Sequence, residues 1–149
     1  MVEESRPDAD DGVALIGLLD AELLRRYPAR SVHGLHAGEE KDPRLLFLVA
    51  RLNGEPVGCG ALRELGPALA EVKRMFVQPG CRKRGIGAKI LVALETAARA
   101  RGYERLVLET GVRQPEARQL YERQGYRAIE AYGEYVGNPF SVCMEKVLS

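Results

Sequence analysis

A basic turn containing glycines joins a predicted strand to a predicted helix in the stretch Val77-Gln78-Pro79-Gly80-Cys81-Arg82-Lys83-Arg84-Gly85-Ile86-Gly87-Ala88-Lys89-Ile90-Leu91. The apolar run Met75-Phe76-Val77 predicts a strand that ends at Pro79-Gly80, and the pattern from Ala88 onward predicts a helix. The first N–H groups of a helix lack intrahelical partners and lie at the positive end of its dipole. The stretch therefore predicts an anion-binding loop.

The spacing of the glycines indicates which anion this loop binds. Gly85 and Gly87 allow close approach of the backbone, and positive charge comes from the three residues before them, Arg82, Lys83 and Arg84. A Walker A loop is absent, and a dinucleotide fingerprint would need glycine where Ile90 stands. We interpret the remaining pattern, Arg-x-x-Gly-x-Gly, as a pyrophosphate site. The alternative is a basic N-terminus on a surface helix.

Length and composition favour one globular domain over residues 1–149. The chain has 46% hydrophobic residues and a net charge of +1, which argues against a dedicated nucleic-acid binder. No apolar run is long enough to span a membrane, and the acidic N-terminus lacks the order of a signal peptide. Three cysteines without metal-ligand spacing predict reduced thiols and no metal site. We therefore expect a cytoplasmic protein that binds neither membrane nor nucleic acid.

Hydrophobic periodicity predicts a mixed α/β (α+β) domain. Helices are expected at residues 13–27, 88–101 and 115–124, and strands at 45–52, 57–65, 68–77, 106–108, 126–129 and 141–147. The polar residues 1–12 are expected to fray. The three strands before residue 78 predict an antiparallel meander. The strand–helix–strand order that follows predicts a right-handed crossover, hence a parallel central pair with flanking helices.

A second motif makes a family resemblance specific. The segment is Gln114-Pro115-Glu116-Ala117-Arg118-Gln119-Leu120-Tyr121-Glu122-Arg123-Gln124-Gly125-Tyr126. It resembles the pattern Asn-x-x-Ala-x-x-Leu-Tyr, three residues, Gly, aromatic, with Gln114 in place of Asn. Together with the strand over 71–77 and the basic loop, it resembles the GNAT superfamily of acyl-CoA-dependent N-acetyltransferases over roughly residues 45–147.

The resemblance implies a single GNAT-like domain that uses acetyl-CoA as a co-substrate. It places the pantetheine arm where a bulged central strand splays from the next parallel strand, with the backbone of Met75–Val77 stabilising the oxyanion. The expected cofactor-binding residues are Met75, Phe76, Val77, Arg82, Lys83, Arg84, Gly85, Ile86, Gly87, Ala88, Gln114, Ala117 and Tyr121.

Acetyl transfer to an amine needs a base for the ammonium and a proton donor for the leaving thiolate. The resemblance places Tyr121 as the general acid; the alternative is a core tyrosine. Glu71 matches the strand position where some members of the family carry the catalytic base, and strict alternation would put it on the same face as Met75 and Val77. Its alternative is a structural carboxylate paired with Arg74 or another charge, and Glu109 is the reserve base.

We therefore expect an acetyl-CoA-dependent N-acetyltransferase that works by direct attack in a ternary complex on a small-molecule or amino-acid-like primary amine. A non-catalytic acyl-CoA-binding regulatory domain and a protein N-terminal or lysine acetyltransferase are the alternatives. The acceptor would lie between residues 24–42 and 130–140, with Glu130, Tyr132 and Glu134 as substrate-binding residues. The alternatives for the segment 130–140 are that it merely joins two strands or that it packs against a second subunit, which would make the protein a homodimer.

Overall fold

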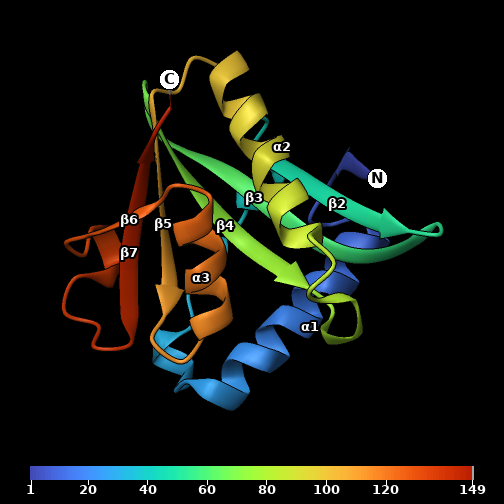
Figure 1. Cartoon of the computed structure of the whole chain (residues 1–149), viewed down its shortest axis with the longest axis horizontal. Coiled ribbons are helices and arrows are strands. Elements are labelled where there is room, and N and C mark those ends of the chain that lie inside the picture. Colours follow the sequence, from blue (N-terminus) through green and yellow to red (C-terminus); the bar gives the residue numbers. More distant parts are fainter. Residues whose placement is uncertain (149) are drawn as a thin grey trace.

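The computed structural model describes residues 1–148 and is built around one seven-stranded mixed sheet (Figure 1). The strand order is β1-β2-β3-β4-β5-β7-β6. The strands are β1 Val2–Ser5, β2 Leu46–Leu52, β3 Glu55–Gly66, β4 Leu69–Val77, β5 Arg105–Gly111, β6 Arg127–Ile129 and β7 Ser141–Val147. The α-helices are α1 Asp10–Arg26, α2 Ile86–Ala100 and α3 Pro115–Arg123. Short 3₁₀ turns occur at η1 Ala29–Ser31, η2 Glu39–Lys41, η3 Pro79–Cys81 and η4 Gly133–Tyr135.

The helices cover the sheet from both faces because each has one apolar stripe. On one face, Ile90, Leu91 and Leu94 of α2 and Tyr121 of α3 belong to the larger buried cluster. On the other face, α1 contributes to a smaller cluster that includes Phe76. No helix within residues 1–148 is both long enough and apolar enough to cross a membrane.

The predicted parallel pair lies at the centre of the sheet and is confirmed. β4 and β5 pair in parallel from Leu69↔Arg105 to Val72↔Leu108, and the paired register ends there although both strands continue. The crossover through α2 joins them, as the strand–helix–strand order predicts. The antiparallel pairing of β2, β3 and β4 is confirmed as well.

A bulge in β4 overturns one predicted side-chain orientation. Opposite β3, the pair Cys59↔Phe76 is followed by Ala61↔Lys73, so β4 carries one extra residue, and Arg74 has a φ of 56° there. The extra residue reverses the alternation of side chains. Met75 and Val77 therefore pack with Ala70 and Val72 on the α2 face. Glu71 lies on the opposite face, so its predicted placement beside Met75 and Val77 is wrong.

The N-terminal segment is more ordered than its polar composition predicts. Residues expected to fray form β1, which pairs antiparallel with β2 from Val2↔Ala50 to Ser5↔Phe47. α1 also begins at Asp10, three residues earlier than expected. Arg51 on β2 forms ion pairs with both Glu3 and Asp11 and so joins β1 and α1 to the sheet. Propensity alone does not reveal such a long-range partner.

Candidate active site

The loop before α2 has the open backbone geometry that an anion needs. Gly85 is the N-cap of α2 with a φ of 77°, and a Cβ placed on it would meet no atom within 4 Å. Within residues 1–148, the N–H groups of Ile86, Gly87 and Ala88 have no hydrogen-bond acceptor. At Gly87 a Cβ would come within 3.0 Å of the Leu120 side chain, so this glycine also permits close packing of α2 on α3. The loop can therefore accept a phosphate group through its backbone.

The three basic residues of the loop divide into one structural and two exposed side chains. Arg82 donates from Nη2 to both carboxylate oxygens of Glu22 on α1, at 2.9 and 3.0 Å, and from Nε to the Val77 carbonyl at 2.8 Å. It therefore joins the loop to α1. Lys83 and Arg84 are exposed and remain available to an anion.

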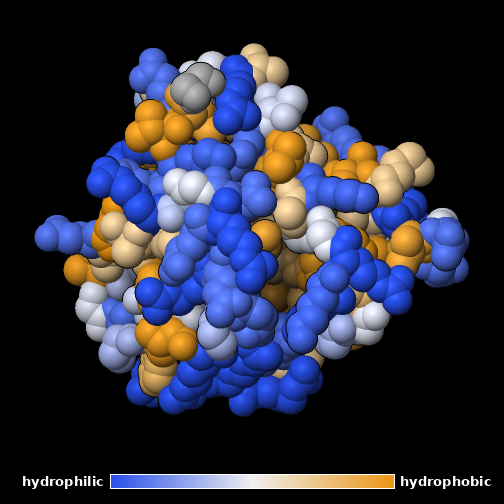
Figure 2. Space-filling model, viewed as in Figure 1, coloured by the Kyte–Doolittle hydropathy of each residue, from blue (hydrophilic) through white to orange (hydrophobic). Residues whose placement is uncertain are grey.

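A pocket opens where β4 and β5 separate. Figure 2 shows a hollow with an apolar floor between α3 and the start of α2, and partly buried Met75, Val77, Ile86 and Ala117 border the core in this region. The pocket is lined by Lys73, Arg74 and Met75 of β4, by Glu109, Thr110 and Gly111 of β5, and by Gln114, Ala117 and Tyr121. The rest of the lining includes Tyr27 at the end of α1, Ser31, Val32 and His33 from the segment after it, and Tyr135 and Phe140 from the segment before β7. The fork therefore opens into a pocket that reaches from α3 to the end of α1 and the segment before β7.

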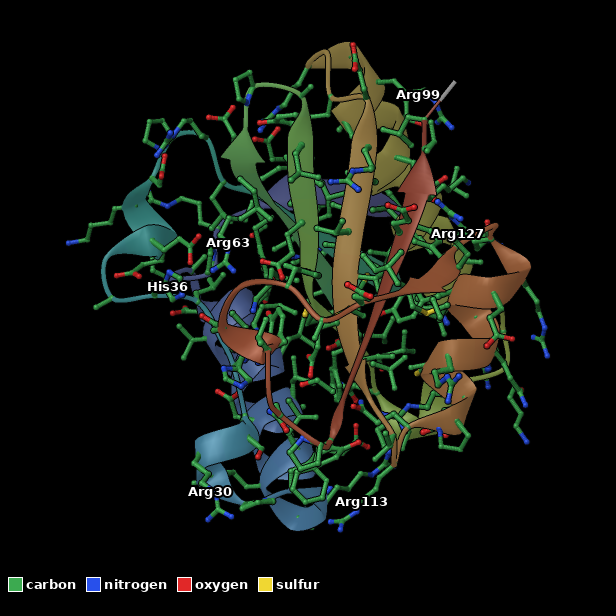
Figure 3. The ribbon with its side chains drawn as sticks, turned by 90° about the vertical axis from the view of Figure 1, so that its left-hand side faces the viewer. Arg30, His36, Arg63, Arg99, Arg113 and Arg127 are labelled. Atoms are coloured by element: carbon green, nitrogen blue, oxygen red, sulfur yellow. The ribbon has the colours of Figure 1, made fainter. Side chains whose placement is uncertain are left out.

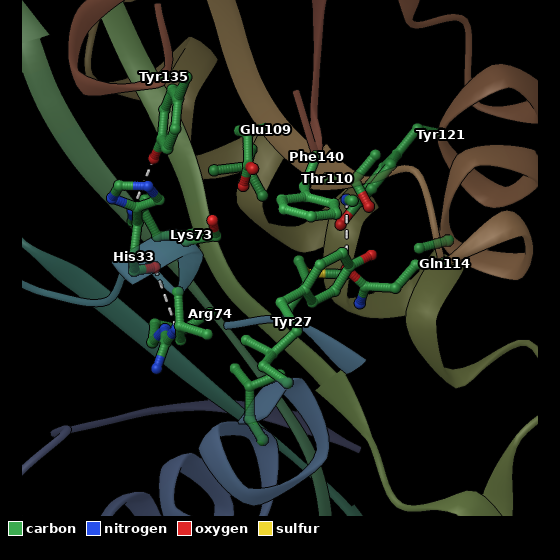
Figure 4. Close-up of a pocket in the computed structure, with 18 residues that line it drawn as sticks. Tyr27, His33, Lys73, Arg74, Glu109, Thr110, Gln114, Tyr121, Tyr135 and Phe140 are labelled. Carbon is green, nitrogen blue, oxygen red and sulfur yellow. Dashed lines mark hydrogen bonds between the residues drawn. The ribbon is translucent and has the colours of Figure 1, made fainter. Parts of the chain in front are cut away.

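Tyr121 reaches this pocket from α3 and is 5% exposed (Figure 4). Its ring also packs edge-on against Tyr126, with the ring centroids 5.9 Å apart, so it shares the larger buried cluster. Burial, and then the charge of Glu109, raise the pKa of Tyr121 above its ordinary value, which keeps the phenol protonated. A protonated hydroxyl in the pocket can donate a proton.

Glu109 lies at the fork, at the first β5 position beyond the paired register. Figure 4 shows it between Tyr135 and Tyr121. Burial raises the pKa of Glu109 to about 7, although the Ser141 hydroxyl, which donates to Oε2 at 2.7 Å, opposes that effect. A carboxylate with this pKa can gain or lose a proton near neutral pH.

Glu71 is fully buried at 0% exposed and is not among the residues that line the pocket. Arg63 forms an ion pair with its Oε1, and its Oε2 accepts hydrogen bonds from Tyr132 at 2.6 Å and Tyr135 at 3.0 Å. Both oxygens therefore have protein partners. Arg63, rather than Arg74, is the paired cation.

The segment 130–140 lies against residues 31–39 (Figure 3), and Tyr135 and Phe140 line the pocket rather than Glu130, Tyr132 or Glu134. The Glu134 carboxylate lies 3.0 Å from His33 Nδ1 and 3.1 Å from His36 Nε2. Burial opposes the lowering of the Glu134 pKa, but the contacts with His36, Lys73 and His33 outweigh it. Glu130 is exposed and outside the lining, and Tyr132 is engaged with Glu71.

Sequence reasoning assigned no role to several residues that line the pocket. The sequence motifs give Lys73 no role, whereas in the structure it directly precedes the β4 bulge and its side chain lines the pocket. Arg74 donates to Asp20 at 2.6 Å and to the His33 carbonyl at 3.1 Å, so it holds α1 and the following loop against β4. Gln114, which was expected to bind the cofactor, also accepts from the Gly111 N–H at 3.2 Å and so closes the turn into α3. A charged residue in an otherwise buried strand was the available signal for Lys73.

Comparison with known proteins agrees with this geometry. The family model described as Acetyltransferase (GNAT) family matches residues 14–126. An IAA acetyltransferase of Azospirillum brasilense is 43% identical over 148 residues, covering 99% of this chain and 97% of that protein.

Two solved structures share the fold. A Klebsiella pneumoniae protein provisionally named an acyl-CoA N-acyltransferase has a TM-score of 0.85 at 34% identity, with 100% of this chain and 97% of that chain covered. A GNAT family acetyltransferase of Elizabethkingia anophelis, crystallised with acetyl-CoA bound, has a TM-score of 0.72 at 18% identity, with 99% and 97% covered. The predicted family is thereby confirmed: this chain belongs to the GNAT family of acetyltransferases and is an acyltransferase.

Proposed function

We propose that this enzyme transfers the acetyl group of acetyl-CoA to a primary amine of a small molecule by direct attack in a ternary complex. One observation carries the proposal: Glu109 and Tyr121 line the same pocket, at the fork between β4 and β5. A base for the amine and an acid for the leaving sulfur are therefore available in one cavity.

The residues around the α2 loop fit the phosphates of CoA. Gly85 leaves the cradle open, the first N–H groups of α2 lack protein acceptors within residues 1–148, and Lys83 and Arg84 are exposed beside them. Acetyl-CoA supplies the activated acyl group when bound. We assign the phosphate contacts to Gly85–Ala88 with Lys83 and Arg84, and we place the pantetheine arm along Met75–Val77, Gln114 and Ala117.

The backbone of β4 beyond the fork fits the role of oxyanion stabiliser. From Lys73 onward, β4 has no β5 residue in register, so the polar groups on that edge are not used by the sheet. The β3 edge remains paired at Phe76 and Val77, which keeps the strand rigid. An N–H group of Met75–Val77 held in this way costs little reorganisation when charge develops.

We assign the base to Glu109 and the general acid to Tyr121. Glu109 lines the pocket and has a pKa of about 7, whereas both oxygens of Glu71 have protein partners outside it. In this proposal Glu71 is a positioning residue that holds Tyr132 and Tyr135. Tyr121 remains protonated because burial raises its pKa, so it can protonate a thiolate.

The acceptor proposal rests on the enclosure of the pocket. Glu109 shares the pocket with Tyr27, His33, Tyr135 and Phe140, which come from the end of α1, the segment after it and the segment before β7. This arrangement favours a compact amine, including amino-acid-like amines, over a lysine within a folded protein.

The test is turnover with a panel of small primary amines, measured as release of CoA thiol and as acetylated product by mass spectrometry. We expect release only when both substrates are present, and no acetylated protein after incubation with acetyl-CoA alone. An acetyl group on the enzyme would contradict direct attack. Acetyl-CoA binding without release for any amine, peptide or protein acceptor would favour the regulatory-domain alternative.

A further inference from the structure

Lys73 is a buried cation on the wall of the pocket that the proposed chemistry does not use. It lies on β4 directly before the bulge and is 6% exposed. Its Nζ donates to the Tyr135 hydroxyl at 2.8 Å. The side chain lines the pocket, with Tyr135 on one side and Glu109 on the neighbouring strand (Figure 4). The ammonium therefore faces the space that the acceptor must enter.

No carboxylate within residues 1–148 forms an ion pair with Lys73. The acidic groups around it have other partners: Glu71 pairs with Arg63, and Glu134 interacts with His33 and His36. The Tyr135 hydroxyl stands between Lys73 and Glu71, donating to Glu71 while it accepts from Lys73. Burial lowers the pKa of Lys73, as expected for an ammonium that has lost water without gaining a direct counter-ion.

The other charged groups of the pocket do not supply a counter-ion for Lys73. Arg74 adds positive charge, and that charge is already balanced by Asp20. Glu109 is the proposed base and must itself meet the amine. One carboxylate, Glu109, and two cations, Lys73 and Arg74, are the acidic and basic residues of the lining besides His33. The Nη atoms of Arg74 are engaged with Asp20 and the His33 carbonyl, whereas the Lys73 ammonium makes one hydrogen bond and keeps two donors for a ligand.

The positions of Lys73 and Glu109 set a distance between the groups they would bind. Val72↔Leu108 is the last parallel pair, so Lys73 and Glu109 are the next residues on adjacent strands and share a face. Adjacent strands lie about 4.8 Å apart where they pair, and the fork widens from there. An amine at Glu109 and an anion at Lys73 are then separated by a few bonds.

We infer that the acceptor carries an anionic group, a carboxylate or phosphonate, one or two carbons from its primary amine, and that Lys73 binds this anion. The inference rests on the proposed function and narrows its substrate class. It differs from the expectation that Glu130 and Glu134 are the substrate-binding carboxylates. Glu134 contacts two histidines, and Glu130 does not line the pocket.

The experiment compares amines that differ in the anionic group. Pairs are alanine with ethylamine, phenylalanine with phenethylamine, and 2-aminoethylphosphonate with propylamine. We expect kcat/KM of the wild type to favour the best anionic amine over its partner by about 10- to 100-fold, the range of a charge-assisted contact. In Lys73→Met this preference should fall close to one, while acetyl-CoA affinity stays unchanged. Lys41→Met, at an exposed lysine in η2, is the matched control and should keep the preference.

Three outcomes would overturn the inference. If the wild type acetylates the uncharged partners as well as the anionic amines, the acceptor is not anionic, although the proposed function stands. If Lys73→Met lowers kcat/KM equally for both members of a pair, Lys73 only balances the buried charge around Glu71. If no amine of either kind leads to release of CoA, the proposed function is wrong and this inference is wrong with it.

Product inhibition gives a second measurement that does not need a folded variant. N-acetylphenylalanine should compete with the amine substrate of the wild type at least 10-fold better than N-acetylphenethylamine. Equal inhibition by the two compounds would contradict an anion site even if Lys73→Met does not fold.

Discussion

Replacing Glu109 with glutamine should make the protein more stable and less active at the same time. In the wild type, burial raises the pKa of Glu109 from an ordinary value of 4.5 to about 7. Below pH 4.5 the carboxyl is protonated in both the folded and unfolded states and carries no penalty. As the pH rises from 4.5 to 7, the unfolded chain loses this proton before the folded protein does, so the free energy of unfolding falls.

The size of this effect follows from the width of the pH window. Each pH unit in which the two states differ by one proton is worth about 1.4 kcal/mol, so the full loss is about 3 kcal/mol by pH 8. Glutamine has nearly the same shape and no charge to bury, and it can still accept the hydrogen bond from Ser141. Glu109→Gln should therefore keep at pH 8 most of the stability that the wild type loses between pH 5 and pH 8.

Urea unfolding at pH 5 and pH 8 measures the stability difference, and the rate–pH profile measures the role in catalysis. The wild-type kcat/KM should rise with pH through a limb near pH 7, and Glu109→Gln should lose that limb together with about 10²-fold or more in rate. Glu104→Gln, at an exposed residue just before β5, is the control and should change neither. A variant that keeps both the limb and the wild-type pH dependence of stability would refute the assignment of Glu109 as the buried base.

Substitutions at three further positions test the remaining parts of the site. Gly85→Glu should abolish acetyl-CoA binding in calorimetry, because it places a negative side chain at the phosphate site. Gly85→Asn should retain much of the binding, because asparagine tolerates the positive φ. Equal affinities for both variants would exclude this loop as the phosphate site. Tyr121→Phe should lower kcat by about 10²-fold with little change in acetyl-CoA affinity, and full activity would make Tyr121 a core residue. Glu71→Gln should cost about 1.5–3 kcal/mol in urea unfolding because it removes the buried carboxylate charge that pairs with Arg63 and leaves Arg63 with Glu39 alone; a loss below about 1 kcal/mol would contradict that structural role.

The parts of the fold that the sequence predicted best are those fixed by local patterns. Proline and glycine mark the end of β4 and the start of α2, and the apolar period of α2 requires burial against the sheet. The bounds of β4 and α2 were therefore predicted to within two residues. β7 was predicted at its observed bounds, Ser141–Val147. β1 was missed because its polar sequence becomes a strand only through pairing with β2 and ion pairs with Arg51.

The candidate site was predicted in outline, and its polar residues only in part. The loop at Gly85, the α3 position of Tyr121 and the fork between the two strands follow from motifs. The choice of Glu109 over Glu71 as the proposed base could not be made from the sequence, because it depends on one extra residue in β4 that strict alternation cannot reveal. The partners of Glu134 come from a segment about a hundred residues earlier, and no local pattern indicates such a contact.

The left-handed residue in β4 also limits how this strand can change length during evolution. Arg74 is the single residue that sets the phase between the first and second halves of the strand. Deleting one residue there would rotate Met75 and Val77 out of the α2 layer and would move Phe76 out of the α1 layer, exchanging partners in two cores at once. Relatives that keep this architecture should therefore tolerate insertions and deletions at the Asn53-Gly54 turn but not between Glu71 and Val77.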